Sequence, residues 1–384
     1  MEKESILINN ELVKSGKNFL GILNDIKRRP EDASRELQIP IEEIHAMIEG
    51  KKPLSQELIK MATKIWPVNA RDFYVIQDDC PLGVKIMRSK ESEKSSRIME
   101  RAGKPYYEYR DTAMSSLAPF RPEWIMELCT VDDNNPNNPN VQWNNGHFMH
   151  QFTYFIGDVN FYYLDLDGKK QVAIMNTGDS MYIAPFTPHT FTTRVGAEKN
   201  GLILALTYGN KLTGDIQQEL SSISSELGQD YALDFSSREH AFSSLLTFHR
   251  EIGSVSIKEL SKRSGIIDKK IEDFENNGTI PSEIELQTLS SSLNINVRDL
   301  LPNEKVAQKV ILQSHDEGKT WLYPESENYK FHDLTSSSAL PYSKAFEINV
   351  LSKDDPSFDL KVGLHQYLYN LGNTDVHLNW LYDN

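Results

Sequence analysis

The stretch NNGHFMHQ, residues 144–151, is followed by short alternating segments, by the turn Gly-Asp at 178–179, and by PFTPH, which ends at His189. The surrounding segments, such as FYYLDLDG and HTFTTRV, alternate apolar and polar residues as β-strands do. Asp-Gly, Thr-Gly-Asp and Pro turns separate these segments, which is typical of antiparallel barrels and jelly rolls. We therefore predict that residues 76–210 form an antiparallel barrel.

Histidine, glycine and proline follow the pattern of a metal site in this region. NNGHFMHQ and GDSMYIAPFTPH resemble the two halves of the cupin metal motif, a Gly-His-rich half followed by G-D…P…H. A lone histidine is more often structural, but one in each motif half favours a metal site. Imidazole and oxygen donors with open positions suit iron(II) and oxygen chemistry. The side chains expected inside the barrel are His147, His150, Gln151, Ile183 and His189.

An internal repeat organises the chain. The segment ASRELQIPIEEIHAMIEG at 33–50 is typical of a helix-turn-helix, and LSKRSGIIDKKIEDFENN at 260–277 matches it. HQFTYFIG, beginning at His150, is similarly repeated as HQYLYNLG, beginning at His365. Different elements that recur in the same order indicate a duplicated unit. The predicted fold class is therefore α+β, a duplicated unit of an all-α helix-turn-helix domain plus a cupin (antiparallel jelly-roll) barrel.

The repeat also predicts the domain boundaries. We expect a helix-turn-helix-like domain at 1–75, the cupin barrel with the metal site at 76–210, a helical connector and second helix-turn-helix-like domain at 211–305, and a degenerate second barrel at 306–384. The returning strands of that second barrel are not visible in the sequence, so we expect it to be incomplete.

The composition restricts the cellular location and the partners that we predict for the protein. The 384 residues contain only two cysteines, so no disulfide framework is expected. There is no apolar run near the ~20 residues that a membrane span needs. The N-terminal residues lack the apolar core of a signal peptide, and we predict a cytoplasmic protein. The net charge of −14 opposes nonspecific binding to nucleic acid or anionic lipid.

The stretches GKPYYEY, NNGH and GDSMYIAPFTPH are similar to a phosphonate-biosynthetic family, the pair formed by hydroxyethylphosphonate dioxygenase and methylphosphonate synthase. The resemblance covers essentially the whole chain and implies a mononuclear Fe(II) site. In the dioxygenase a Glu ligand stands six residues before the second His, where this sequence has Ile183. In the synthase a Gln stands four residues after the first His, as Gln151 follows His147. The resemblance thus implies the ligands His147, Gln151 and His189.

The resemblance also implies substrate contacts. Arg101 corresponds to a phosphonate clamp, Tyr109 to a hydroxyl donor and Asn144 to a further donor, and His189 borders the same site. Lys27 corresponds to a family lysine that reaches from a helical domain into the active site of a neighbouring unit. Lys27 and Tyr109 are therefore expected to be catalytic, although each could instead be a solvated charge or a structural donor. We also expect a homo-oligomer.

The second copy has lost a ligand, because Gln366 is present but Val362 stands where His147 does. We therefore expect only the first barrel to bind iron. The reaction implied is Fe(II)- and O2-dependent cleavage of the carbon–carbon bond of 2-hydroxyethylphosphonate, which gives methylphosphonate and carbon dioxide or bicarbonate. The alternative within the family is the dioxygenase reaction, which gives hydroxymethylphosphonate and formate.

Two other classes of protein were weighed. Small-molecule-sensing transcription factors also combine a helix-turn-helix with a cupin barrel. The predicted recognition helix at 41–50, however, carries Glu42, Glu43 and Glu49 and no Lys or Arg. Such a helix repels DNA phosphates and lacks the side chains usually used for guanine, so no nucleic-acid partner is expected. A sugar-phosphate or mannose-type isomerase would need a carboxylate and more histidines in the barrel.

Overall fold

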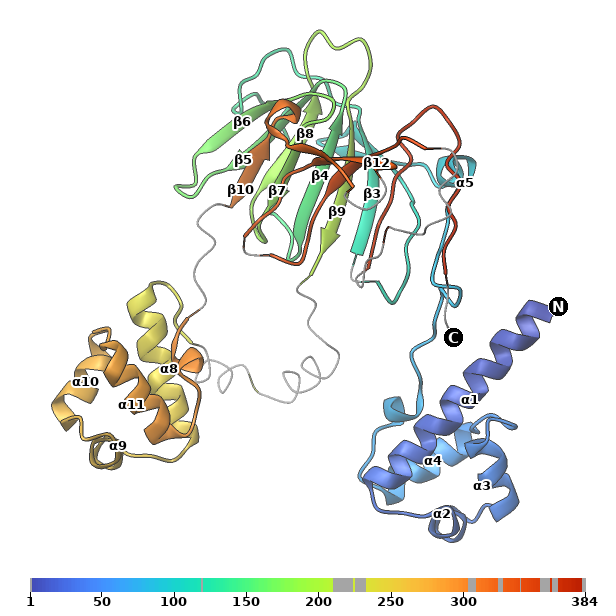
Figure 1. Cartoon of the computed structure of the whole chain (residues 1–384), viewed down its shortest axis with the longest axis vertical. Coiled ribbons are helices and arrows are strands. Elements are labelled where there is room, and N and C mark those ends of the chain that lie inside the picture. Colours follow the sequence, from blue (N-terminus) through green and yellow to red (C-terminus); the bar gives the residue numbers. More distant parts are fainter. Residues whose placement is uncertain are drawn as a thin grey trace. The chain divides into compact units, whose positions relative to one another are not determined.

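The computed structural model divides the chain into two compact units. One comprises Met1–Ser96, Arg110–Pro122 and Asp354–Asn384, and the other comprises Arg97–Tyr109 and Glu123–Lys353 (Figure 1). The structure describes residues 2–118, 120–209, 224, 233–302, 309–323, 327–338, 340–352, 360 and 365–381, with side chains from residue 11 onward. Among these residues there is no helix long and apolar enough to cross a membrane.

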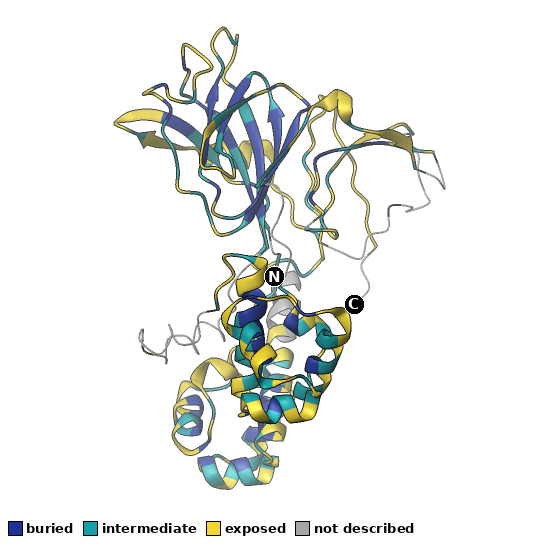
Figure 2. Cartoon of the chain, turned by 90° about the vertical axis from the view of Figure 1, so that its left-hand side faces the viewer, coloured by how far each residue is buried: buried dark blue, intermediate teal, exposed yellow. Residues whose placement is uncertain are grey.

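The N-terminal helices pack around one apolar core. They are α1 (Glu2–Asp25), α2 (Pro30–Leu37), α3 (Ile41–Ile48), α4 (Gln56–Ile65) and the 3-10 turn η1 (Ala70–Phe73), followed by the short α5 (Ser89–Lys94). Phe19, Leu37, Ile44 and Leu58 are fully buried or nearly so and belong to one core cluster. Figure 2 shows buried and exposed residues side by side along these helices. Ser55 caps the N-terminus of α4, because its side chain accepts the Leu58 N–H. Apolar residues at helical spacing thus produce the helices predicted at 33–50.

A second group of helices has the same order of elements. It contains α8 (Arg238–Ile252), α9 (Ile257–Ser264), α10 (Asp268–Asn276), α11 (Glu283–Leu293) and the 3-10 turn η2 (Val297–Leu300). Gly265 ends α9 in a left-handed conformation, as Gln38 ends α2. The helices predicted at 260–277 are therefore present. Most of the connector predicted from residue 211 onward lies outside the described residues.

The barrel consists of two antiparallel sheets. Its strands are β1 (Arg97–Arg101), β2 (Lys104–Arg110), β3 (Phe120–Glu127), β4 (His150–Ile156), β5 (Val159–Leu164), β6 (Lys170–Met175), β7 (Ser180–Ile183), β8 (His189–Thr193), β9 (Leu202–Tyr208) and β10 (Val310–Gln313). The order in the larger sheet is β1-β2-β3-β9-β4-β7-β10, and the order in the smaller sheet is β6-β5-β8. Phe155, Phe161, Ile183, Phe191 and Ile203 belong to one buried core cluster drawn from both sheets. Mixed helices and antiparallel sheets are thus confirmed.

The C-terminal part adds a three-stranded sheet of β11 (Thr320–Leu322), β12 (Tyr329–Asp333) and β13 (Phe346–Val350). Strand β10 instead pairs with β7 of the larger sheet, with Val310 opposite Ile183. A strand that begins the predicted second barrel therefore completes the sheet of the first. The predicted counterpart of β4, from His365 onward, forms no strand within residues 365–381.

Gly178 allows the C-terminal part to pack closely on the barrel. Its φ is +95°, and a Cβ there would lie 2.7 Å from Cδ2 of His315. His315, which begins the 3-10 turn η3 (His315–Glu317), donates its backbone N–H to Asp179 Oδ1 at 2.9 Å. The Gly178–Asp179 turn of the motif therefore forms the contact with His315.

Gly178→Ala should therefore lower the free energy of unfolding, by ~1–3 kcal/mol from backbone strain and overpacking. Gly168→Ala is the matched control, because Gly168 has a φ of +75° but no atom within 4 Å of its added Cβ. Urea unfolding of both variants separates the two effects. Equal losses for the two would show that the His315 contact is unimportant.

Candidate metal centre

Three predicted ligands converge inside the barrel. His147 lies in the loop before β4, Gln151 lies in β4, and His189 begins β8. The ring centroids of His147 and His189 are 5.2 Å apart, and Nε2 of His147 lies 2.8 Å from Oε1 of Gln151. Gln151 and His189 are buried and His147 is half-buried. The structure therefore brings these three side chains together.

The backbone determines which nitrogen of each histidine is free. Nδ1 of His147 lies 2.7 Å from the Met149 carbonyl oxygen, and Nδ1 of His189 lies 2.8 Å from the Thr187 carbonyl oxygen. Because a carbonyl oxygen only accepts hydrogen bonds, both Nδ1 atoms carry protons, which leaves a lone pair on Nε2 in the neutral ring. Burial lowers the pKa of His189 to about 4, so this ring is neutral at neutral pH.

The contact between His147 and Gln151 fits a cation. Gln151 donates its side-chain N–H to Thr153 Oγ1 at 2.8 Å, which turns its oxygen toward His147. When its Nδ1 carries the proton, Nε2 of His147 presents a lone pair toward that oxygen, 2.8 Å away. A bound cation can be shared by these two atoms, and hydrogen bonds that fix the ligand tautomer are usual around metal sites. The donor set therefore fits a metal ion such as Fe(II).

The side chain of Asn144 connects the NNGH loop to His189. Its Oδ1 accepts the backbone N–H groups of Gly146 and His189, both at 2.9 Å, and its Nδ2 lies 3.2 Å from His189 Nε2. Gly146 has a φ of +77°, and a Cβ there would lie 2.7 Å from the Phe186 carbonyl carbon. The Gly in NNGH is thus required by a close backbone approach.

His150 does not belong to this site, contrary to the sequence-based expectation. Its Nδ1 lies 2.7 Å from Tyr182 Oη, and the two rings are stacked. Successive side chains of a strand point to opposite faces, so His150 and Gln151 of β4 cannot both face the barrel interior.

Arg101 is hydrogen-bonded to β8, the strand that begins with His189. Its Nη1 donates to the Gln142 carbonyl oxygen at 2.6 Å and to Thr190 Oγ1 at 3.3 Å. The guanidinium carbon lies 5.1 Å from the centroid of the Tyr106 ring and 4.8 Å from that of Tyr107. Both hydrogen bonds within the described residues use Nη1, so Nε and Nη2 can still serve a ligand.

Tyr109 lies two residues along β2 from Tyr107, with ring centroids 5.8 Å apart and perpendicular rings. Burial, and then the carboxyl groups of Glu123 and Glu127, raise the pKa of Tyr109. Its hydroxyl therefore keeps its proton at neutral pH and can donate a hydrogen bond.

Comparison with known proteins now identifies the family. The chain is 61% identical over 373 residues to the methylphosphonate synthase of Nitrosopumilus maritimus, which covers 97% of this chain and 82% of the relative. The chain belongs to the methylphosphonate synthase family. No protein-family model matches it.

Solved structures agree with this family. Streptomyces albus HEPD, determined with 2-hydroxyethylphosphonate and Fe(II) bound, is 36% identical with a TM-score of 0.74, over 89% of this chain and 76% of that one. PhpD, determined with cadmium, is 16% identical with a TM-score of 0.62, over 85% of this chain and 76% of that one, and shows the fold alone.

Gln151 and Ile183, the two positions that distinguish the synthase from the dioxygenase in sequence, are neighbours in this methylphosphonate synthase homologue. They are directly opposite each other in the pairing of β4 with β7. Ile183 is completely buried and offers no atom to a metal. Val310 of β10 is opposite Ile183 on the other side of β7. The predicted ligand Gln151 and the apolar Ile183 are therefore paired at one register position of the sheet.

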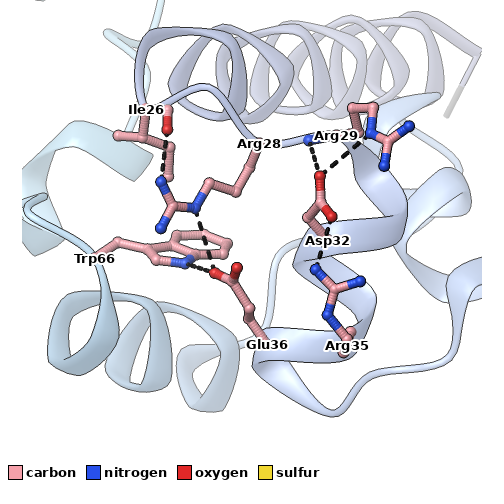
Figure 3. A network of polar contacts seen from close by, with 7 residues as sticks. All are labelled: Ile26, Arg28, Arg29, Asp32, Arg35, Glu36 and Trp66. Atoms are coloured by element: carbon pink, nitrogen blue, oxygen red, sulfur yellow. Dashed lines mark hydrogen bonds and ion pairs between the residues drawn. The ribbon is translucent and has the colours of Figure 1, made fainter.

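Lys27 lies in the other unit, so its predicted part in the site stays a prediction. It is exposed in the turn after α1, with a φ of +59°. Figure 3 shows the contacts that hold this turn. Arg28 donates to the Ile26 carbonyl oxygen at 2.8 Å and pairs with Glu36 at 3.4 Å, and Trp66 Nε1 donates to Glu36 at 2.6 Å. Val362, the second-copy counterpart of His147, lies outside the described residues.

Glu123 and Glu127 of β3 were not among the site residues predicted from the sequence. They alternate with Ile125, a member of the barrel core, and so share its inward face. Glu127 is completely buried, and neither of its carboxyl oxygens has a hydrogen-bond partner among the described residues. The signal in the sequence that could have indicated these inward-facing acids is the alternation of Glu123, Ile125 and Glu127 along one strand.

Burial raises the pKa of Glu127 well above its usual value of 4.5. The positive charge of Arg101 lowers this pKa, but by less than burial raises it. Above pH 4.5 the unfolded chain loses this proton while the folded protein keeps it, so stability falls as pH rises toward the folded pKa. Glu127→Gln should therefore be more stable than wild type by ~1–3 kcal/mol near pH 8, with the gain vanishing below about pH 4.

Urea unfolding at several pH values measures this effect, and Glu198→Gln, at an exposed position, serves as the control. A gain that does not depend on pH would contradict the account of Glu127.

Proposed function

We propose that this chain converts 2-hydroxyethylphosphonate, with Fe(II) and O2, to methylphosphonate and carbon dioxide or bicarbonate by oxidative carbon–carbon cleavage. The 61% identity to a methylphosphonate synthase supports this reaction. The observation that supports the proposal most strongly is the register of Gln151 directly opposite Ile183, because an amide side chain then neighbours the position at which the dioxygenase pattern has a carboxylate.

His147, Gln151 and His189 would hold the iron, through two imidazole nitrogens and the amide oxygen. When bound, Fe(II) supplies a place where substrate oxygens and O2 meet, together with the electron transfer that O2 chemistry requires. The histidine tautomers, fixed by the Met149 and Thr187 carbonyl groups, keep both Nε2 lone pairs directed for this purpose.

Arg101, Tyr109 and Asn144 would bind and orient the substrate. A phosphonate dianion is recognised best by charge-assisted hydrogen bonds, and Arg101 has Nε and Nη2 to offer. Its link through Thr190 to the strand of His189 fixes the distance between the anion-binding group and the metal ligands. Tyr109 adds a neutral hydroxyl donor, and Asn144 an amide beside His189 Nε2.

The substrate itself supplies all the electrons that reduce O2. 2-Hydroxyethylphosphonate plus O2 gives methylphosphonate, bicarbonate and a proton, so atoms and charge balance. Methylphosphonate results if the phosphonate-bearing carbon receives hydrogen from the one-carbon fragment, and hydroxymethylphosphonate if it receives a hydroxyl group. The neutral Gln151 leaves the site one charge more positive than a Glu ligand would, which favours retention of the formate-like fragment. A barrier difference of ~1.4 kcal/mol suffices for a tenfold product ratio.

The domain layout belongs to the same proposal. Two groups of helices with matching element order support a duplicated helix-turn-helix plus cupin unit in which only the first barrel binds iron. Lys27 would then enter the site of a neighbouring unit in a homo-oligomer. Its exposure and its braced turn support this role.

Anaerobic loading with Fe(II), followed by 2-hydroxyethylphosphonate and O2, tests the reaction when products are read by phosphorus NMR. Methylphosphonate is the expected product. Mainly hydroxymethylphosphonate would instead assign the chain to the dioxygenase reaction.

A further inference from the structure

The hydroxyl group of Thr190 is the common hydrogen-bond partner of three side chains from the other sheet of the barrel. Its Oγ1 lies 2.8 Å from Tyr107 Oη, 3.2 Å from Tyr106 Oη and 3.3 Å from Arg101 Nη1. Thr190 and the two tyrosines are buried, and Arg101 is half-buried. The partners come from β1 and β2 of the larger sheet, whereas Thr190 lies in β8 of the smaller one. Thr190 therefore connects the two sheets next to His189.

Backbone groups fix the two tyrosine hydroxyls that meet Thr190. Phe191 donates its backbone N–H to Tyr107 Oη at 3.0 Å, and Gln142 donates its backbone N–H to Tyr106 Oη at 3.1 Å. Strand β8 is an edge strand of the smaller sheet, so the tyrosines take the place of a neighbouring strand there. Both hydroxyl oxygens are thus held in place before Thr190 binds them.

Thr190 and Arg101 can form only one kind of hydrogen bond with each other. A guanidinium has no acceptor atom, so Arg101 donates and Thr190 Oγ1 accepts. A hydroxyl oxygen has two lone pairs and one proton, which allows Thr190 to accept from Arg101 and one tyrosine while it donates to the other tyrosine. The bonding capacity of the Thr190 hydroxyl is then full.

The side chain of Thr190 does not face the metal ligands. Phe191 belongs to the core cluster of the barrel, and its ring centroid lies 5.7 Å from that of His189. Successive side chains of a strand point to opposite faces, so Thr190, which stands between these two residues, faces away from them. Loss of its hydroxyl group should therefore leave the three proposed ligands in place.

Arg101 needs an anchor because it is the last residue of β1, an edge strand of the larger sheet. A long side chain loses much conformational entropy when it is ordered, and a ligand that must order it binds more weakly. The bonds from Nη1 to Thr190 and to the Gln142 carbonyl oxygen order the guanidinium in advance. Because the guanidinium is planar, they also set the directions of Nε and Nη2.

We propose, on the basis of the substrate site proposed above, that Thr190 is a positioning residue for phosphonate binding. Its hydroxyl group holds the Arg101 guanidinium in the orientation that presents Nε and Nη2 to the substrate. Thr190 itself contacts neither the substrate nor the iron. Its effect on binding passes through Arg101, so the effect should disappear when residue 101 no longer has a guanidinium.

The test is the dissociation constant of 2-hydroxyethylphosphonate, measured by isothermal titration calorimetry on Fe(II)-loaded protein without O2. Thr190→Val keeps the shape of the side chain but lacks the hydroxyl. It should weaken substrate binding about 10-fold, the effect of losing one hydrogen bond to a charged group, while Fe(II) affinity stays at the wild-type value. Thr190→Ser retains the hydroxyl and should restore most of the substrate affinity.

Thr192→Val is the matched control. Thr192 is also completely buried and lies on the same face of β8, but its hydroxyl donates to Tyr162 Oη at 3.4 Å. This variant should bind the substrate as wild type does. Equal weakening by Thr190→Val and Thr192→Val would contradict a specific role for Thr190.

A double-mutant cycle separates the proposed role from a general weakening of the fold. In an Arg101→Lys background, Thr190→Val should have little further effect on substrate affinity. Additive losses would overturn the inference, and so would wild-type affinity in Thr190→Val. Thr190→Ala gives the same distinction if the valine variant does not fold. A wild-type protein that does not bind 2-hydroxyethylphosphonate would instead overturn the proposed function.

Discussion

His189→Ala should abolish detectable Fe(II) binding and turnover. The variant removes one of the two imidazoles, and the adjacent Gln151 oxygen and His147 nitrogen cannot hold the ion alone. The loss should exceed the roughly 10–100-fold that follows removal of a group supporting a metal ligand. Anaerobic Fe(II) titration and phosphorus NMR of the product measure the two effects.

The matched control is His150→Ala, which removes a buried imidazole that bonds Tyr182 on the opposite face of β4. It should retain stoichiometric iron. If His189→Ala binds iron as wild type does, or if His150→Ala loses it, the ligand set is wrong.

Arg101→Lys should bind iron normally but use 2-hydroxyethylphosphonate poorly. Lysine keeps the charge but loses the planar guanidinium, its contacts with the rings of Tyr106 and Tyr107, and its hydrogen bond to Thr190. A charge-assisted hydrogen bond contributes ~1.5–3 kcal/mol, so KM should rise about 10–100-fold. Steady-state kinetics across substrate concentration gives the value.

Lys104→Ala is the control for Arg101→Lys, because Lys104 is an exposed cation at the start of the neighbouring strand β2. It should leave KM unchanged. An Arg101→Lys enzyme with wild-type KM would remove Arg101 from the substrate site.

The convergence of His147, Gln151 and His189 was predictable because its signal is local. His147 and Gln151 stand in one motif half and His189 in the other, and the two antiparallel sheets bring these halves together. The position of Ile183 six residues before His189 carried the family distinction, and the register of β4 with β7 gives it a spatial meaning.

Residues whose role depends on which face of a strand they occupy were not predictable in the same way. His150 was expected in the site, but its neighbour Gln151 takes the inward face and leaves His150 against Tyr182. Glu127 was not predicted because an acid in a strand is normally solvent-facing, whereas this side chain of β3 is completely buried. A shift of one residue reverses every such assignment.

The pairing of strands that are far apart in the sequence could not be predicted either. The repeat placed residue 310 in a second barrel, yet β10 joins β7 of the first sheet. Repeated segments share local propensity, but the partner of an edge strand depends on which backbone groups remain free after the rest of the sheet has formed.

Isotope transfer during turnover is the most direct test of the proposed reaction. Substrate deuterated at the hydroxyl-bearing carbon would be supplied, with O2, to enzyme loaded anaerobically with Fe(II), and the phosphonate product analysed by mass spectrometry and NMR. We expect methylphosphonate with deuterium from that carbon in its methyl group. Hydroxymethylphosphonate as the main product, or methylphosphonate whose methyl group contains no deuterium, would contradict it.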